Sequence, residues 1–364
     1  MSDNLRRYRA IRDALTPWYP GQPTGTVARH LTTLAALISG IVGSKSTQLP
    51  PIATHVPDGT KPESRGKRFA RWVSNDRITE DGYVVPYAKV LLAQLALQTL
   101  VLVIDGSVVG RGCVALMLHV VSKGRALPLA WRVRQGQKGH CPEALHLALV
   151  KQGQELIPEG ASVVLRGDGA CDGVDLQHTL EEAGGSSVCR TGMHRTASWD
   201  GETFRLDTLG VCRKPGTLIA FKEVRFTGEA DGPILLICCG AKGYQDPLSV
   251  VTNRHAAEQA CRLYEKRFRI ETCFADQKSR GFPLHTSHQE HSVILTAQRD
   301  SFYNRGKLNY HPIGKDSRWA AQRLSRYPRC AQAPSGRGCA MNSTLALTSG
   351  SIGWRSSCPI PKRA

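Results

Sequence analysis

The sequence lacks the features that mark several common classes of protein. Its N-terminus, MSDNLRRYRAIRDALTPWYP, has no apolar core of the kind that a signal peptide needs. The longest apolar-leaning stretch, Leu31 to Gly43, is too short to span a bilayer. None of the 12 cysteines belongs to a Cys-x-x-Cys pair or a zinc-type set, and no P-loop, haem or flavin signature occurs. We therefore expect a cytoplasmic protein with reduced, mostly structural cysteines, no membrane partner and no organic cofactor.

Acidic residues are scarce relative to basic ones. The 364 residues include 48 Lys and Arg against 30 Asp and Glu, which gives a formal net charge of +18. A surplus of this size favours a polyanionic partner, usually nucleic acid. An acidic membrane surface, or a basic surface with no partner, would give the same count. The length suffices for two or three domains.

Residues 1–90 have the pattern of a helical, basic module. The segment TVARHLTTLAALISGIVGS has helical apolar spacing, and SRGKRFARWVSN places Lys67, Arg68 and Arg71 beside Phe69 and Trp72. A basic helix with interleaved aromatic residues suits contact with a phosphate backbone. The alternative is a solvated helix face over a buried Trp72. We predict a DNA-binding module in which the three basic residues contact DNA.

Residues 91–192 change to the pattern of a mixed α/β layer. TLVLVIDGS contains an apolar run that ends at Asp105, as expected for a strand buried on both faces. CVALMLHVV and LPLAWRVR follow as two strands of a hairpin. A helix from Pro142 to Leu156, a strand ending in Asp168, a second helix and the strand SSVCRTG complete the order.

The remaining segments differ from this layer and from each other. Residues 193–253 contain short apolar runs separated by Gly, Pro and Asp, which predicts a β-rich insertion. Helical character returns over residues 254–288, mainly from His255 to Arg280. Residues 289–364 have no sustained period and carry 12 Lys and Arg against three Asp and Glu. We expect disorder or poor packing in this basic tail.

Two acids, Asp105 and Asp168, occupy equivalent positions. Each ends an apolar strand and precedes a glycine. Either one alone is adequately explained as a turn residue, because Asp-Gly is an ordinary turn signal. Neighbouring strands, however, would bring both carboxylates together, and like charges that close either raise one pKa or hold a metal. Asp172 competes with Asp168 for this role but lies further beyond the strand end.

A third acid, Glu271, lies in the segment YEKRFRIETCFADQK. On a continuous helix, at about 100° per residue, Tyr264, Arg267, Glu271 and Lys278 fall within an arc of about 60°. An apolar stripe borders this arc and would dock the helix on the sheet. The alternative is an amphipathic helix in which Glu271 pairs with Arg267 at i, i+4.

The spacing Tyr-x2-Arg-x3-Glu-x6-Lys resembles the signature of the transposases of the insertion sequence four family. VIDGS around Asp105 and LRGDGACDG around Asp168 resemble the first and second acidic motifs of that family. The resemblance covers roughly residues 20–288. It implies an α/β fold: an RNase H-like mixed-sheet catalytic core over residues 91–192 and 254–288, with a β-rich insertion and a helical N-terminal module.

The resemblance also implies a mechanism. Asp105, Asp168 and Glu271 would form an Asp-Asp-Glu triad that holds two Mg²⁺ (or Mn²⁺) ions. The ions would promote in-line displacement at a phosphodiester, first to cut the element ends and then to join the 3′ ends to target DNA. The partners would be double-stranded DNA, as terminal inverted repeats and target, and a second copy of the chain in a dimer.

Further DNA contacts are expected from the same resemblance. Tyr264, Arg267 and Lys278 would hold the phosphates of the terminal nucleotides, Arg267 by bidentate contact and Lys278 as a point charge. Trp199, in the β-rich insertion, could stack on a base flipped from the element end. A core position is the alternative for Trp199.

The sequence is also compatible with other interpretations. The sequence after residue 289 lacks the apolar helices that the family pattern would lead us to expect, so an out-of-frame tail is one hypothesis and a true basic DNA-binding tail is another. The chain could be an RNase H-like nuclease of another role, which cuts DNA without joining it. It could also be a degenerate DNA-binding remnant without catalytic activity.

Overall fold

The computed structural model describes most of the chain up to residue 276. The described residues are 3–19, 21–110, 112–136, 141–209, 217–226, 231–240, 247–253 and 256–276. Lys278 and the whole of the basic tail over residues 289–364 lie outside them.

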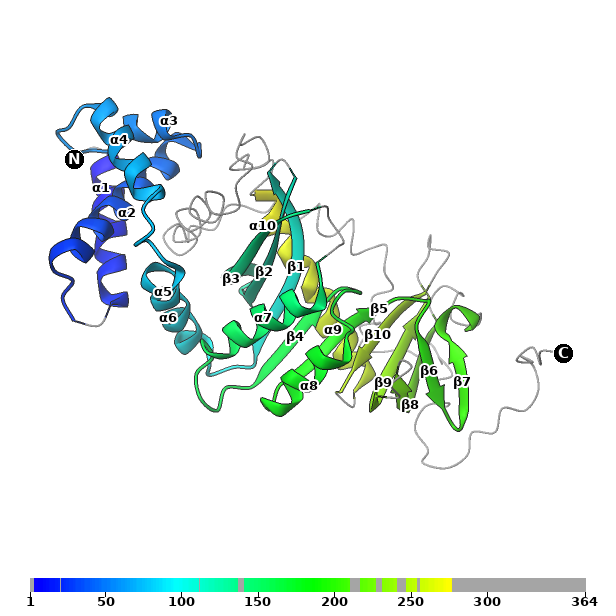
Figure 1. The fold of residues 1–364 in the computed structure, drawn as a ribbon. Coiled ribbons are helices and arrows are strands. Elements are labelled where there is room, and N and C mark those ends of the chain that lie inside the picture. The colour runs from blue at the N-terminus through cyan, green and yellow to red at the C-terminus, as the bar shows by residue number, and fades with distance from the viewer. Residues whose placement is uncertain are drawn as a thin grey trace, which may run out of the picture.

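The described residues up to Leu95 form helices and the turns between them, as predicted. These elements are α1 (Asp3–Leu15), the 3-10 turn η1 (Thr16–Trp18), α2 (Gly25–Ser44), α3 (Leu49–Thr54), α4 (Pro62–Val73), α5 (Glu80–Tyr83) and α6 (Val85–Leu95). Figure 1 shows α1 to α4 gathered at one end of the molecule, with α5 and α6 between them and the sheet.

Helix α2 is longer than the apolar stretch seen in the sequence. Its 20 residues are long and apolar enough to cross a membrane, by length and composition alone. Leu34, Ile38 and Ile41 are nevertheless buried in the same core as residues of α1, α3 and α4. Burial in this helical core accounts for the apolar face of α2.

Within the described residues, ten strands form one mixed sheet. Its order is β3-β2-β1-β4-β5-β10-β9-β8-β6-β7. The strands are β1 (Leu100–Gly110), β2 (Cys113–Ser122), β3 (Arg125–Gln135), β4 (Val163–Gly167), β5 (Ser186–Thr191), β6 (Thr196–Trp199), β7 (Glu202–Arg205), β8 (Leu218–Phe226), β9 (Asp231–Cys239) and β10 (Leu248–Thr252). Strands β1, β4 and β5 are parallel neighbours, and β2 is antiparallel to β1.

The strands of the predicted insertion extend the central sheet. Strand β10 pairs antiparallel with β5, and β9 pairs with β10. The insertion therefore continues the same hydrogen-bonded ladder, which leaves β5 without a free edge. Periodicity identifies each strand but not its neighbour, so this continuity is visible only in the structure.

Helices cover the two faces of the central strands. Helices α7 (Glu143–Gln154) and α8 (Val174–Glu182) lie on one face, and α9 (Ala257–Glu265), the 3-10 turn η4 (Lys266–Phe268) and α10 (Arg269–Ala275) lie on the other (Figure 1). Along β4 the faces alternate: Val163 and Leu165 line a cavity beneath α7 and α8. Val164 packs instead with Tyr264 of α9. A strand buried on both sides needs this continuous apolar run.

The strand order 3-2-1-4-5, with helices on both faces, is that of an RNase H-like core. The predicted order of three strands, helix, strand, helix and strand over residues 91–192 is confirmed. The predicted class, an α/β RNase H-like mixed sheet with β-rich and helical additions, is therefore the observed one.

Candidate active site

The register between β1 and β4 sets Asp105 level with Asp168. These parallel strands pair up to Val103 and Arg166. Asp105 lies two residues after Val103, and Asp168 lies two residues after Arg166. Because side chains alternate along an extended strand, both acids are on the same face as that pair. Neighbouring strands lie about 4.8 Å apart. Both carboxylates act electrostatically on one arginine, Arg267, which agrees with this placement.

Strand β1 does not end at Asp105, and that prediction was wrong. Asp105 stands opposite Met117, and the ladder with β2 continues as far as Gly110. Only the pairing with β4 ends before Asp105. An Asp-Gly pair is a turn signal in an isolated strand, but here the long hairpin with β2 keeps the chain extended. On one side, the backbone of Asp105 is held in the ladder with β2. On the other side, the pairing of β1 with β4 has already ended.

Asp168 sits in a tight turn that follows β4 directly. Its Oδ1 accepts a hydrogen bond from the Ala170 backbone at 3.1 Å, and its carbonyl accepts one from Cys171 at 2.9 Å. Gly167 makes this turn possible, since a Cβ there would lie 2.2 Å from the Cys171 Cβ. Asp168 is thus a turn residue, as the alternative stated, and the same turn orients its carboxylate.

Asp172 anchors the same loop and stands apart from the acid pair. Its carboxylate is buried and accepts hydrogen bonds from Arg195 Nη2 at 2.7 Å, Arg195 Nε at 3.1 Å and Thr191 Oγ1 at 2.7 Å. The pKa of Arg195 is raised by its hydrogen bond to Asp172. The lower rank given to Asp172 as a catalytic acid fits these contacts, because they tie the loop after Asp168 to the start of the insertion.

The predicted continuous helix over residues 255–280 is interrupted. Helix α9 ends at Glu265, η4 spans Lys266–Phe268, and α10 starts at Arg269. The two halves dock on different strands: Tyr264 packs beside β4, β5, β9 and β10, whereas Phe274 stacks edge-on against His119 of β2. Because sheets twist by about 20–25° per strand, a straight helix could not keep both contacts. The tighter 3-10 turn corrects its direction.

Arg267 lies at this break and forms an ion pair with Asp105. Its Nη1 donates to Asp105 Oδ2 at 2.8 Å, and the two side chains are only 11% and 13% exposed. Its guanidinium also lies over the rings of Tyr264, at 5.8 Å, and Phe268, at 5.3 Å. Burial works to lower the Arg267 pKa, but Tyr264, Asp105 and Asp168 outweigh it and raise the pKa. The guanidinium therefore remains charged beside the acids.

Glu271 follows Arg267 by four residues, on α10, and is half-buried. Within the part of the chain that the structure describes, no three His, Cys, Asp or Glu side chains are grouped closely enough to hold a metal. The predicted three-acid cluster is thus not assembled in this conformation. Asp105 and Asp168 stand level with each other, and Glu271 lies on α10, directly after the 3-10 turn that carries Arg267.

Sequence reasoning missed a second arginine on this face of the sheet. Arg166, two residues before Asp168, is fully buried, and burial lowers its pKa to about 9. None of its three guanidinium nitrogens forms a hydrogen bond with another described residue. The charged Arg166 inside the otherwise apolar run VVLRG was the feature of the sequence that could have indicated it.

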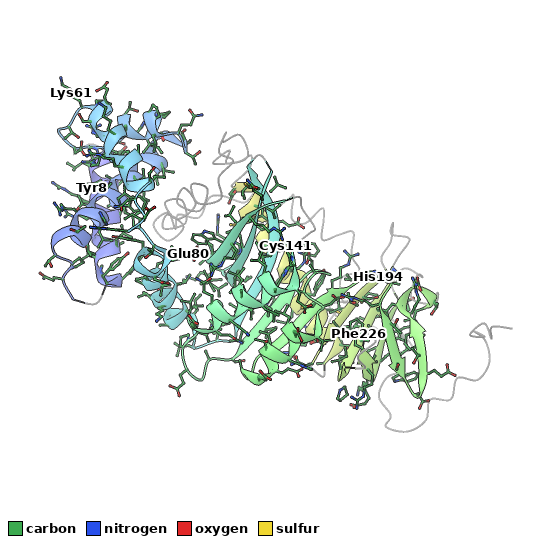
Figure 2. All side chains as sticks on the ribbon, viewed as in Figure 1. Tyr8, Lys61, Glu80, Cys141, His194 and Phe226 are labelled. Carbon is green, nitrogen blue, oxygen red and sulfur yellow. The ribbon has the colours of Figure 1, made fainter. Side chains whose placement is uncertain are left out.

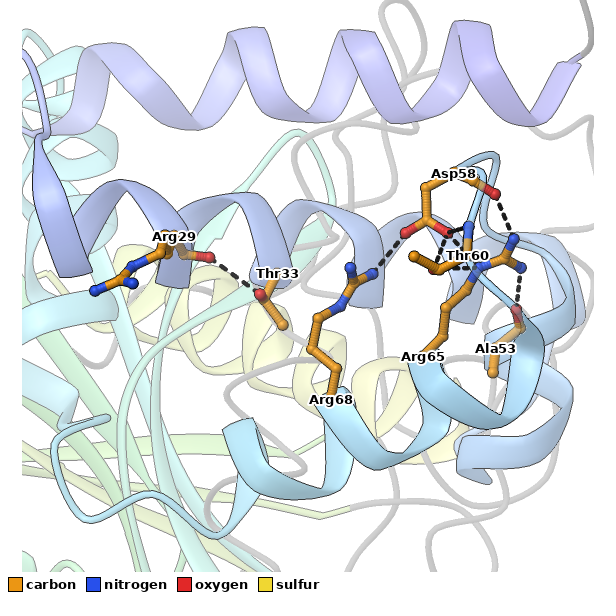
Figure 3. Close-up of polar contacts among 7 residues, drawn as sticks. All are labelled: Arg29, Thr33, Ala53, Asp58, Thr60, Arg65 and Arg68. Atoms are coloured by element: carbon orange, nitrogen blue, oxygen red, sulfur yellow. Dashed lines mark hydrogen bonds and ion pairs between the residues drawn. The ribbon is translucent and has the colours of Figure 1, made fainter.

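The predicted DNA contacts of the helical module differ in their surroundings. Lys67 and Arg71 are exposed on α4, whose first turn follows Lys61 at the outer end of the module (Figure 2). Arg68 is instead tied to Asp58, with Nη2 donating to Oδ2 at 2.7 Å. Figure 3 shows that Arg65, a residue not singled out from the sequence, shares the same carboxylate.

This Asp58 cluster (Asp58, Thr60, Arg65 and Arg68) has the features of a structural clamp. Arg65 also donates from Nη1 to the Ala53 carbonyl at 2.7 Å, so it joins α4 to the end of α3. Burial works to raise the Asp58 pKa, but hydrogen bonds from Thr60, Arg68 and Arg65 lower it to about 2. The ion pair with Asp58 engages the Nη2 of Arg68, while Lys67 and Arg71 are exposed and open to a phosphate backbone.

The two tryptophans singled out from the sequence both take part in packing. Trp199 of β6 packs against Phe221 of β8, with ring centroids 5.5 Å apart at 75°. Trp199 is half-buried and packs against the hydrophobic core, and this edge-to-face aromatic pair stabilises the insertion. Trp72 is buried at 4% exposure, beneath the basic face of α4.

No family model matches this sequence, and no curated protein does. Among solved structures, it is similar to a cryo-EM structure of the piggyBac transposase synaptic complex with hairpin DNA, at 13% identity over 95% of this chain and 88% of that chain, with a TM-score of 0.44. It is also similar to a crystal structure of human ENDOV, at 12% identity over 62% of this chain and 98% of that chain, with a TM-score of 0.25.

Proposed function

We propose that this chain is a DNA transposase of an insertion sequence, which cuts the element ends and joins their 3′ ends to target DNA. One observation carries the proposal: Asp105 on β1 stands level with Asp168, which directly follows the parallel strand β4, beneath the helical segment that bears Arg267 and Glu271. The net charge of +18 supports a DNA partner. We further propose that it works in the bacterial cytoplasm as a dimer on two element ends.

The acid pair has the chemistry of a divalent-cation site. Carboxylate oxygens are the donors that Mg²⁺ and Mn²⁺ prefer, and the Arg267 guanidinium already shows that positive charge is stable against Asp105. Asp105 and Asp168 would hold the ions, with Glu271 as the third carboxylate. Two bound ions would activate the attacking oxygen and stabilise the leaving oxygen at a phosphodiester.

The remaining residues of the site would bind and orient the DNA. Arg267 stays charged and can offer two parallel N–H groups to a phosphate. Burial raises the Tyr264 pKa, so its phenol stays protonated and can donate a hydrogen bond. Lys278, which lies outside the described residues, would add a point charge. In the helical module, Lys67 and Arg71 would contact the duplex further from the reacting bond.

A strand-transfer assay tests this function. The DNA that flanks the gene should contain inverted repeats, and a duplex ending in such a repeat should be cut in Mg²⁺ and joined to a plasmid target. We expect Asp168→Asn to reduce both steps by about 10³-fold or more, as for other residues that act as a catalytic unit. Asp175→Asn, which removes an exposed acid from the first turn of α8, is the matched control and should keep full activity. Equal activity in both variants would exclude this assignment.

The inactive-remnant alternative is favoured by one observation. No three-acid group is assembled within the described ranges up to residue 276. A remnant would bind the repeats but would show no Mg²⁺-dependent cleavage, and Glu271→Ala would change nothing. An RNase H-like nuclease of another role would cut without joining, so the same assay separates the three readings.

A further inference from the structure

We propose that Arg267 is an exchangeable counter-ion of the acid pair: it blocks cation binding in the DNA-free protein, and a DNA phosphate withdraws it, so that DNA and metal bind cooperatively. The inference rests on the proposed function and adds to it a mode of regulation at the same site.

Arg267 and a cation would compete directly for one oxygen of Asp105. Asp105 Oδ2 accepts from Arg267 Nη1 at 2.8 Å, and Asp105 Oδ1 accepts from the Gly106 backbone at 2.7 Å. A carboxylate with both oxygens engaged has little capacity left for a metal. A guanidinium cannot be deprotonated near neutral pH, so Arg267 can release Asp105 only by moving.

The pairing of Arg267 is also incomplete. Its Nε is buried and has no hydrogen-bond partner among the residues described. A phosphate accepts two parallel hydrogen bonds from the guanidinium fork and so would engage more of its donors than Asp105 does. The residue is held well enough to stay in place, yet a phosphodiester would hold it better.

Arg267 is the middle residue of the 3-10 turn η4, between α9 and α10. Such turns have poorer hydrogen-bond geometry than an α-helix, and within a helix they often mark a hinge. If the three residues of η4 relax to α-helix, α10 rotates by about 60° relative to α9, because the two helix types differ by about 20° per residue. That rotation is large enough to redirect Glu271.

Charge gives the expected direction of coupling. With Arg267 in place, the two carboxylates carry one compensating positive charge, and once it leaves they face a cation with their full charge. By linkage, DNA then strengthens metal binding by the same factor as metal strengthens DNA binding. Couplings of this kind are about 5- to 150-fold.

Mn²⁺ binding to the full-length protein, followed by electron paramagnetic resonance without DNA, tests the inference. We expect Arg267→Met to tighten Mn²⁺ binding by about 10-fold or more, because the competitor is gone. Arg269→Met is the matched control: it removes the same charge two residues away, from a side chain that points to Gly124 in the β2–β3 turn, and should leave Mn²⁺ binding unchanged. Equal tightening in both variants, or none in Arg267→Met, would overturn the proposal.

A second measurement covers the case in which Arg267→Met does not fold. Asp105→Asn frees Arg267 from its carboxylate, so its affinity for a blunt-ended duplex in EDTA should rise, whereas Asp175→Asn should match the wild type. A fall in affinity for Asp105→Asn would contradict the exchange.

The two proposals fail separately. Tighter Mn²⁺ binding in Arg267→Met, in a protein that never cuts DNA, would keep the counter-ion and discard the transposase. Cleavage by the wild type with no change of Mn²⁺ affinity in Arg267→Met would do the reverse.

Discussion

Two Asp–Arg pairs, Asp172–Arg195 and Asp105–Arg267, differ in how completely each is bonded. Asp172 and Arg195 share two hydrogen bonds, with a third from Thr191, in a carboxylate that is 1% exposed. Asp105 and Arg267 share one, and a buried nitrogen of Arg267 lacks a partner among the described residues. An ion pair whose hydrogen bonds are all made would lose bonds if either partner bound another group, so it is suited to a structural role. An ion pair that leaves a donor without a partner can gain hydrogen bonds when its arginine binds another group, so it is suited to a role in binding.

The largest effect is expected at the Asp172–Arg195 pair. Arg195→Ala leaves the Asp172 carboxylate buried without its cation and should lower the free energy of unfolding by about 3–5 kcal/mol, measured by urea denaturation. Arg205→Ala breaks an exposed pair with Asp207 and should cost less than about 1 kcal/mol. Comparable small losses in the two variants would remove the distinction drawn between these pairs.

Arg166 extends the comparison to an arginine without a hydrogen-bonded partner in the described structure. Burial of its charge is costly, so Arg166→Met should raise the free energy of unfolding by about 1–3 kcal/mol in the same assay. Arg262→Met, an exposed site on α9, should change it by less than about 0.5 kcal/mol. If Arg166→Met destabilises the protein, Arg166 has a partner in the rest of the chain.

The smallest effect is expected at the Asp58 cluster, which is partly open to solvent. The folded-state pKa of Asp58 is about 2, below its ordinary value of 3.8. Its contribution to stability is therefore present above the ordinary value and is lost as the pH falls from 3.8 to about 2. Asp58→Asn should be less stable than the wild type at pH 6, and the two should converge near pH 2 in urea titrations.

Asp13→Asn, which breaks an exposed pair with Arg12, is the control for this pH dependence. Its stability curve should run parallel to that of the wild type. A constant offset for Asp58→Asn across the whole pH range would mean that the cluster acts through packing and not through charge.

Elements with a strong local pattern could be predicted from the sequence. The apolar strands over residues 91–192 and the helices before them form as expected, because their periodicity reports burial directly. The end of β1 could not be predicted at Asp105, since Asp-Gly is a turn signal that the ladder with β2 overrides. The break at η4 was missed for a similar reason: the helical period says nothing of the sheet twist on which the helix docks.

The sequence by itself determined the types of the secondary-structure elements and the candidate acids, Asp105, Asp168 and Glu271, because these depend on local period and residue chemistry. The tertiary structure alone decided which of them meet. The parallel register of β1 and β4 brings Asp105 to Asp168, and the docking of α9 and α10 brings Arg267 to Asp105 across 162 residues of chain. Ion pairs at such separation follow from packing, which local sequence does not encode.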